Sequence, residues 1–226
     1  MTGPLADTTV VIPARNEVAA IGAVVRSVRL LGAARVIVAD DASDDGTAAE
    51  ARSAGAEVVA PRGRGYGWAC HAGAAAADRS QIVGFIDGDG SFDPRDLASL
   101  AQLIRDGADL ALGMRDRTLR MPLHQRLGNG LTLALLRVLY GLSIGDIAPL
   151  RAIRVDALDR LDMRPTRYAW LVEMLAKAAR RRLCIVAVPV RYGPRLGGVS
   201  KVSGSPRGSL LAGIDFLGAL LSYRRW

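Results

Sequence analysis

Residues 81–94 have the sequence QIVGFIDGDGSFDP, in which an apolar run leads directly into two carboxylates, Asp87 and Asp89. A short apolar run bounded by turn residues is typical of a buried strand. Carboxylates at the exit of such a strand provide the oxygen ligands that Mg²⁺ or Mn²⁺ prefers, and these ions commonly bridge one or two carboxylates to substrate phosphates. An isolated Asp-x-Asp triplet also fits a solvated turn, so the surrounding sequence decides between these interpretations.

Strand patterns alternate with helix patterns around this segment. Strands are predicted at 8–12, 36–39, 58–60, 82–86 and 110–112, and helices at 18–31, 45–54, 67–77 and 94–105. This alternation favours right-handed crossovers and an α/β fold with a mostly parallel central sheet flanked by helices. The second half is less regular, with helices predicted at 123–140 and 168–181, strands at 151–154 and 185–190, a loop at 195–207 and a final amphipathic helix from 208.

A polar cluster follows each of the first five predicted strands. Because ligands of an open α/β sheet bind beyond the carboxyl ends of its strands, we expect these clusters to meet at one rim. They are PARNE at 13–17, DDASDDGT at 40–47, RGRGYG at 62–67, DGD at 87–89 and GMR at 113–115. Some members, such as Glu17 or Ser43, could instead cap the helices that follow. The G-x-G-x-G arrangement on the third crossover argues against a dinucleotide site.

Composition narrows the class of partner. The chain has 226 residues, with 30 Lys and Arg against 22 Asp and Glu, and its net charge of +8 suits a phosphorylated substrate or an anionic lipid. No lysine-rich run, zinc spacing or aromatic RNA-binding signature supports nucleic acid as a partner. Cys70 and Cys184 are expected to be buried thiols in a reducing compartment. No charged-then-apolar leader and no run of about 20 apolar residues is present, so we expect a cytoplasmic protein.

Together these motifs resemble the GT-A fold of glycosyltransferase family 2, from Val10 to about Ser205. VVIPARNE at 10–17 resembles the family's first-strand motif, VADDASDDGT at 38–47 its D-D-x-S-x-D-x-T motif, and DGDGSFDP at 87–94 its DxD region, with GMR at the next strand end. Within the family, QRLGN at 125–129, DIAPLRA at 146–152 and RLGGVSK at 195–201 resemble the dolichyl- or polyprenyl-phosphate mannose or glucose synthase branch. We therefore expect one GT-A, Rossmann-like nucleotide-diphospho-sugar transferase domain over 1–226. Its nucleotide-sugar half would span about 1–115, its acceptor half about 116–207 and a C-terminal amphipathic helix about 208–226.

The resemblance implies a role for individual residues. The donor nucleotide would be bound by Pro13, Arg15, Glu17, Asp41, Arg64, Asp87 and Gly88. Asp87 and Asp89 would hold Mg²⁺ or Mn²⁺ on the donor diphosphate. The catalytic candidates are Asp89, Glu173, Asp146 and Arg115, and the acceptor or its phosphate would be bound by Arg126, Arg195, Ser200 and Lys201.

The implied reaction is an inverting, metal-dependent transfer of a hexose from a donor of the UDP-glucose or GDP-mannose type to a polyprenyl phosphate. A lipid phosphate is already an anionic nucleophile and needs no strong base. Many family members carry a Glu-Asp base followed by Q-x-x-R-W, whereas this chain has YAWLVEM at 168–174. The alternative keeps the fold and the donor but uses a soluble hydroxyl acceptor, for which Glu173 would act as the base. Glu173 also fits a purely structural role. A nucleotidyltransferase is disfavoured because it normally opens with a Gly-rich basic loop, which PARNE is not.

Many polyprenyl-phosphate enzymes carry transmembrane helices after the catalytic domain, and this sequence shows none. The predicted helices at 127–140 and 210–221 have apolar faces flanked by arginines, which suits peripheral contact with an anionic membrane on its cytoplasmic side. The same faces equally suit burial in the core or in a homodimer interface, so these alternatives remain open.

Overall fold

The computed structural model describes residues 3–77, 80–115, 123–164, 166–197 and 206–225, without the side chains of 123–127, 206–211 and 225. In this part of the chain a seven-stranded sheet has the order β3-β2-β1-β4-β6-β5-β7. The strands are β1 (Thr8–Ala14), β2 (Arg35–Asp40), β3 (Glu57–Val59), β4 (Ile82–Phe85), β5 (Leu110–Arg115), β6 (Arg151–Arg154) and β7 (Ile185–Val190). Strands from both halves of the sequence therefore share one sheet.

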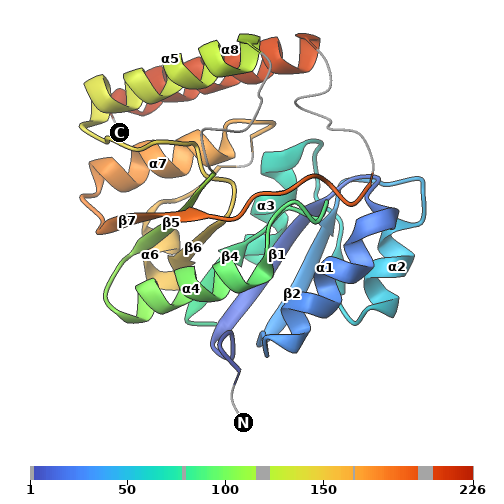
Figure 1. Cartoon of the computed structure of the whole chain (residues 1–226). Coiled ribbons are helices and arrows are strands. Elements are labelled where there is room, and N and C mark those ends of the chain that lie inside the picture. Colours follow the sequence, from blue (N-terminus) through green and yellow to red (C-terminus); the bar gives the residue numbers. More distant parts are fainter. Residues whose placement is uncertain (1–2, 78–79, 116–122, 165, 198–205, 226) are drawn as a thin grey trace.

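Helices cover both faces of this sheet (Figure 1). They are α1 (Val18–Leu30), α2 (Thr47–Ser53), α3 (Tyr66–Ala75), α4 (Pro94–Arg105), α5 (Leu123–Tyr140), α6 (Val155–Arg160), α7 (Trp170–Arg180) and α8 (Pro206–Ser222), with the 3₁₀ turn η1 (Tyr223–Arg225). The predicted α/β architecture with a mostly parallel sheet is confirmed.

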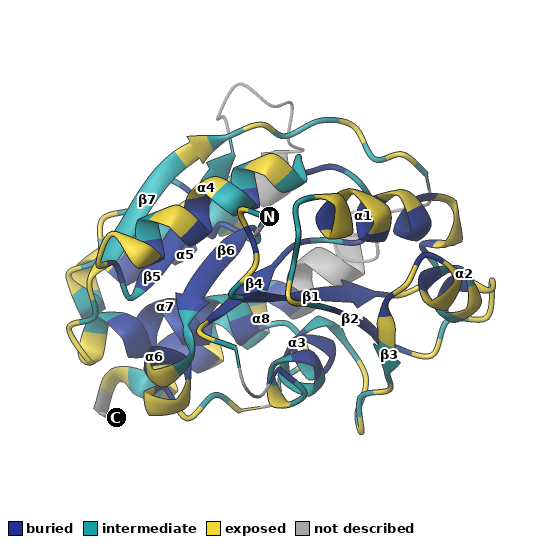
Figure 2. Ribbon diagram, turned by 90° about the horizontal axis from the view of Figure 1, so that it is seen from below, coloured by how far each residue is buried: buried dark blue, intermediate teal, exposed yellow. Residues whose placement is uncertain are grey.

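The sheet buries two hydrophobic clusters, one on each face, because successive strand side chains point in opposite directions. In β1, Val10 and Ile12 pack with residues of α1, α2 and α4, whereas Val11 packs with residues of α3, α6 and α7. Figure 2 shows the result: the central strands are buried, β3 and β7 at the two edges of the sheet are only partly buried, and the helices turn their exposed sides outward. Because both faces are covered, the central strands are nearly continuous apolar runs.

The strand β6 runs antiparallel to both of its neighbours, β4 and β5, while the other paired strands are parallel. Its first residue, Arg151, is paired with Phe85, the last residue of β4, and with Leu112 in the middle of β5. An antiparallel strand brings its amino end to the rim where parallel strands place their carboxyl ends. The loop that precedes β6 therefore joins the loops that follow β1, β2 and β4.

A further layer lies over α7, where α5 and α8 run side by side (Figure 1). Exposed large apolar side chains remain on this pair of helices: Leu131 is 52% exposed, Val138 78%, Ile214 56% and Leu221 63%. Among the described helices, none combines the length and the apolar character needed to cross a bilayer.

Several local predictions need correction. The helix predicted at 45–54 begins at Thr47, because Gly46 adopts the left-handed conformation at φ 92° and the Asp45 carboxylate accepts the Thr47 amide. Ser43, expected as a possible cap, is not its N-cap, which is Gly46. The fifth strand continues through Arg115, and α6, which follows β6 without a loop, was not predicted. Cys70 is buried as expected, but Cys184 is exposed.

Candidate active site

The loops after β1 and β2 are joined by hydrogen bonds that fix the rim of the sheet. The amide of Asn16 donates to Ser43 Oγ at 2.8 Å, and the amide of Glu17 donates to Thr47 Oγ1 at 2.8 Å. Asn16 itself has a left-handed φ of 53°, which turns the chain into α1. Glu17 occupies the N-cap position of α1 but its side chain makes no capping hydrogen bond, so its carboxylate serves another partner.

Asp41, directly after β2, contacts other residues that the sequence predicts to bind the nucleotide. Its side chain is 7% exposed and accepts a hydrogen bond of 2.9 Å from the Gly65 amide. Arg64 lies 3.4 Å from Asp41 Oδ1, and Arg15 lies 3.9 Å from Oδ2, with both guanidinium groups largely exposed. Three residues predicted from separate loops are thus brought together, around a buried carboxylate with two cations at its outer edge.

Asp87 lies at the end of β4, half-buried, and accepts a hydrogen bond of 3.3 Å from the Tyr66 hydroxyl. Burial, followed by the nearby negative charge of Asp89, raises the pKa of Asp87 to about 6. Between the two carboxylates, a Cβ on Gly88 would lie 3.2 Å from Ile21 Cδ1 and 3.3 Å from Ile12 Cγ2. Glycine therefore lets this loop rest tightly on the core.

Asp89 is the more buried of the two carboxylates, at 3% exposure. Its Oδ1 accepts from the Ser91 amide at 2.9 Å and from the Ser91 hydroxyl at 2.6 Å. Its Oδ2 lies 3.0 Å from Nη2 of Arg195. The other terminal nitrogen of that guanidinium, Nη1, lies 3.4 Å from Glu17 Oε1. Pro13, predicted to bind the nucleotide, is buried within β1.

The carboxylates of Asp87 and Asp89 suit a divalent cation whose remaining ligands come from the substrate. Among the described residues, no group of three or more His, Cys, Asp or Glu side chains is arranged to hold a metal ion. Mg²⁺ is usually bound by one or two carboxylates together with substrate phosphates, rather than by a cage made only of protein. Asp87 and Asp89 provide such an incomplete set, and the pKa of Asp87 is raised first by burial and then by the nearby charge of Asp89.

Arg115 and Asp146 form an ion pair at the end of β5. The guanidinium donates through Nε and Nη2, each at 2.8 Å, to the two carboxylate oxygens. Burial would raise the pKa of Asp146, but the hydrogen bonds and charge of Arg115 outweigh it and lower that pKa below its usual value. Two catalytic candidates thus hold each other, which makes Asp146 a weak proton acceptor.

Glu173 lies on α7, in the layer between the sheet and α8. It is fully buried, its Oε1 accepts from the Arg164 amide at 2.9 Å, and Lys177, also fully buried, lies 2.8 Å from the same oxygen. The Lys177 ammonium stands 4.7 Å from the ring centre of Tyr223. These contacts tie α7 to the segments that cover it, and the contacts found for Glu173 include none of the rim carboxylates.

Of the acceptor residues predicted from sequence, only Arg195 has a described side chain. Arg126 lies in α5, and its side chain is outside the described residues, as are Ser200 and Lys201 entirely.

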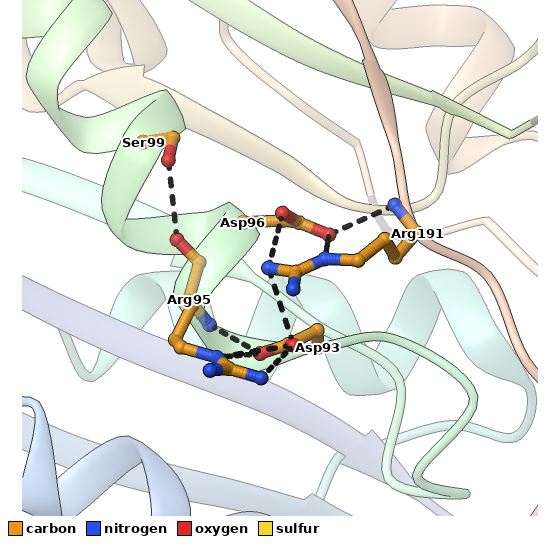
Figure 3. A network of polar contacts seen from close by, with 5 residues as sticks. All are labelled: Asp93, Arg95, Asp96, Ser99 and Arg191. Carbon is orange, nitrogen blue, oxygen red and sulfur yellow. Dashed lines mark hydrogen bonds and ion pairs between the residues drawn. The ribbon is translucent and has the colours of Figure 1, made fainter.

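An open cavity of about 700 Å³ lies beside the Arg115 pair. It is lined by Asp96, Met114, Arg115, Gly145, Pro189, Val190 and Arg191. Figure 3 shows how Arg191 is held there, by Asp96 at 3.1 Å and Asp93 at 3.2 Å.

Two residues at the site were not singled out from sequence. Tyr66 supports Asp87, as described above, and Arg151 is a fully buried arginine beneath the rim. The Arg151 guanidinium donates to the carbonyl oxygens of Ile147, Ala148 and Leu171, and burial lowers its pKa to about 10. It holds the loop before β6 in the shape that directs Asp146 toward Arg115. The DIAPLRA motif contained this residue, but nothing in the motif indicated that its side chain points inward.

Residues 9–162 match the family model for glycosyl transferase family 2. The chain belongs to glycosyl transferase family 2. An uncharacterized glycosyltransferase of Mycobacterium tuberculosis is 41% identical over 210 residues, which cover 92% of this chain and 95% of that protein. A polyprenol monophosphomannose synthase of Mycolicibacterium smegmatis is 30% identical over 226 residues, covering 89% of this chain and 83% of that one. The chain is therefore a glycosyltransferase, as the motifs predicted, and its resemblance to the polyprenyl-phosphate branch is confirmed.

The fold comparison agrees with this membership. Glucosyl-3-phosphoglycerate synthase from Mycobacterium tuberculosis, solved with Mn²⁺, UDP-glucose and phosphoglyceric acid, superposes with a TM-score of 0.78 at 26% identity. The match covers 96% of this chain and 79% of that one. The predicted GT-A fold is confirmed, and this relative binds a nucleotide sugar with a divalent cation.

Proposed function

We propose that this family-2 enzyme transfers a hexose, with inversion, from a nucleoside-diphosphate sugar to a polyprenyl phosphate, with Mg²⁺ or Mn²⁺ as cofactor. The observation that carries the donor half is the adjacency of Asp87 and Asp89 at the end of β4, beside the Arg15, Asp41 and Arg64 group. Their carboxylates would hold the cation against the donor diphosphate. When bound, the cation would neutralise the charge that builds on the leaving nucleoside diphosphate.

The nucleotide would lie over the ends of β1 and β2. Asp41 offers a carboxylate for a base or ribose hydroxyl, and its position is fixed by the Gly65 amide. The exposed guanidinium groups of Arg15 and Arg64 would donate charge-assisted hydrogen bonds to phosphate oxygens.

The cavity beside Arg115 supports a phosphate-bearing acceptor with an apolar tail. The ion pair with Asp146 uses Nε and Nη2 of Arg115 and leaves Nη1 for another acceptor. Met114, Pro189 and Val190 give the same cavity an apolar wall. A polyprenyl phosphate would present an oxygen that is already anionic, so the reaction needs no general base at this position.

The exposed apolar face of α5 and α8 supports delivery from a membrane surface. Leu131, Val138, Ile214 and Leu221 are each more than half exposed. The exposed guanidinium groups of Arg137 and Arg224 belong to the same layer. Apolar residues flanked by cations are typical of helices that lie on anionic lipid. We take an anionic membrane as the partner of this face, and a homodimer as the rival that the vesicle experiment below distinguishes.

A soluble acceptor is the second candidate, because the glucosyl-3-phosphoglycerate synthase structure contains phosphoglyceric acid. A soluble hydroxyl would need a base, for which the sequence offered Glu173. The buried pairing of Glu173 with Lys177 supports a structural role instead. We therefore rank the polyprenyl phosphate first.

The deciding experiment is a transfer assay with radiolabelled UDP-glucose and GDP-mannose. Each donor is incubated with Mn²⁺ and either detergent-solubilised polyprenyl phosphate or phosphoglyceric acid, and label is counted in the organic and aqueous phases. Label in the organic phase with one donor supports the proposal, and NMR of the product establishes inversion. Label found only on the soluble acceptor contradicts the lipid assignment and keeps the donor assignment. Absence of both transfer and donor binding contradicts the whole proposal.

A further inference from the structure

The segment 191–197, which follows β7, is bound along the Asp89 loop. The Gly193 amide donates to the Ser91 carbonyl at 2.8 Å, and the Leu196 amide donates to the Asp89 carbonyl at 2.9 Å. Phe92 and Tyr192 form an antiparallel bridge next to the Gly193–Ser91 hydrogen bond, with their ring centres 4.9 Å apart in an edge-to-face arrangement. These backbone contacts therefore fix the position of Arg195 next to the carboxylate of Asp89.

The Arg195 guanidinium occupies the space between two buried carboxylates. One terminal nitrogen lies 3.0 Å from Asp89 Oδ2, and the other lies 3.4 Å from Glu17 Oε1. The Asp89 and Glu17 side chains are 4% and 10% exposed, whereas Arg195 is 31% exposed. Since Oδ1 of Asp89 accepts both Ser91 hydrogen bonds, Oδ2 is the oxygen available to a cation, and Arg195 is bound to it.

We propose that Arg195 is a built-in counter-ion that makes cation binding at Asp89 conditional on the donor nucleotide. The inference rests on the proposed function, in which Asp89 is a metal ligand. A divalent cation bonds carboxylate oxygen at about 2.1 Å, so it cannot share Oδ2 with a guanidinium without strong like-charge repulsion. A cation that arrives alone must displace Arg195 and leave its charge partly buried without Asp89. A cation that arrives with a diphosphate brings anionic oxygens to which Arg195 can transfer.

The consequence is that binding of the metal at Asp89 depends on the presence of the nucleotide. Without nucleotide, Arg195 neutralises Asp89 and disfavours binding of the metal alone. With nucleotide, the same guanidinium moves from carboxylate to phosphate and adds to donor affinity. Arg195 is thus a positioning and selectivity residue for the metal–nucleotide complex, beyond the phosphate-binding role expected from sequence.

Arg191 provides a matched control, because it anchors the same segment without touching Asp89. Its amide donates to Asp96 Oδ2 at 2.9 Å, and its guanidinium contacts Asp93 and Asp96 (Figure 3). Replacing Arg191 loosens the segment but leaves the Asp89 carboxylate paired. Any effect seen with Arg195 variants and not with Arg191 variants therefore comes from the charge at Asp89.

The test measures Mn²⁺ affinity by titration calorimetry, and by electron paramagnetic resonance of the free ion. It uses the wild type, Arg195→Met, Arg195→Gln, Arg195→Lys and Arg191→Met, each with Mn²⁺ alone and with UDP or GDP present. We expect Arg195→Met and Arg195→Gln to bind Mn²⁺ alone about tenfold more tightly than the wild type, the change that loss of one partly buried charge contact produces. Arg195→Lys, which keeps the charge, and Arg191→Met should stay near the wild type. With nucleotide, the advantage of Arg195→Met should vanish or reverse.

Two results overturn this inference while sparing the proposed function. One is unchanged affinity of Arg195→Met and Arg195→Gln for Mn²⁺ alone, in proteins that still bind the Mn²⁺–nucleotide complex. The other is equal tightening in Arg191→Met and Arg195→Met, which would assign the effect to a loosened segment. If no protein binds Mn²⁺ even with nucleotide, the metal assignment fails and this inference fails with it.

Discussion

Arg115 at the end of β5 and Asp146 in the loop before β6 face each other as a two-point ion pair, with both donor–acceptor distances at 2.8 Å. The two side chains are 15% and 8% exposed, so the pair is largely withdrawn from water. Planar guanidinium and carboxylate groups match in this geometry, which fixes the orientation of Arg115 as well as its charge. The orientation of an arginine that lines the proposed acceptor cavity therefore depends on a carboxylate from a different part of the chain.

Removing the carboxylate should destabilise the fold measurably. Asp146→Asn leaves Arg115 buried without its counter-charge, and we expect the free energy of unfolding to fall by about 3 kcal/mol. Urea denaturation measures this change. Glu50→Gln is the control, because it removes the partner of Arg26 in an exposed pair and should change stability by less than about 1 kcal/mol. Similar values for the two variants would show that the Arg115 pair contributes no more than a surface contact.

The same pair should give the protein an acid-sensitive stability. Folding lowers the pKa of Asp146 below its ordinary value of 3.8, so the folded state binds the proton less readily than the unfolded state. The resulting stabilisation is present above pH 3.8 and is lost as the pH falls through the lower, folded-state pKa. Urea midpoints between pH 7 and pH 3 should therefore fall less steeply for Asp146→Asn than for the wild type. Parallel pH profiles would exclude a contribution from Asp146.

Asp89 should be required for binding of the metal–nucleotide complex. Asp89→Asn removes the ionised oxygen that the cation needs, and we expect affinity for Mn²⁺ with nucleotide to fall by about 100-fold, typical for loss of a charged ligand. Asp93→Asn is a matched control four residues away. Asp93 caps α4 by accepting the Arg95 amide, and asparagine retains that cap. Thermal shifts with Mn²⁺ and UDP or GDP provide the measurement, and loss of the shift in Asp93→Asn alone would relocate the site.

The parts of this site that sequence could predict are those that follow strands. Asp41, Asp87 and Asp89 each follow a buried apolar run within a few residues, and the rule for parallel sheets places such residues at one rim. Asp146 precedes a strand and Arg151 begins it, and both reach the rim only because β6 is antiparallel. Strand direction is a tertiary property that the local pattern at 151–154 does not encode. The contact of Arg195 with Glu17, which spans 178 positions, likewise depends on how the segment after β7 crosses the sheet.

Glu173 should prove structural rather than catalytic. Glu173→Gln removes the negative charge that lies 2.8 Å from the fully buried Lys177 ammonium, so the free energy of unfolding should fall by about 3 kcal/mol. Turnover of folded protein should fall less than tenfold, whereas loss of a general base would lower it by about 100-fold or more. The double variant Glu173→Gln/Lys177→Met should recover part of the stability. A loss of kcat beyond 100-fold with unchanged stability would restore the soluble-acceptor alternative.

The apolar face of α5 and α8 should bind anionic vesicles. Val138 is 78% exposed on α5, and a charge at this position would oppose insertion among lipid headgroups. We expect Val138→Glu to weaken sedimentation with phosphatidylglycerol vesicles by about tenfold, as expected for losing an apolar contact and adding a charge of the lipid's own sign. Leu30→Glu is the control, since Leu30 is 86% exposed on α1, away from this layer. If Val138→Glu instead converts a dimer to a monomer in sedimentation velocity, with vesicle binding unchanged, a second copy of the chain covers this face.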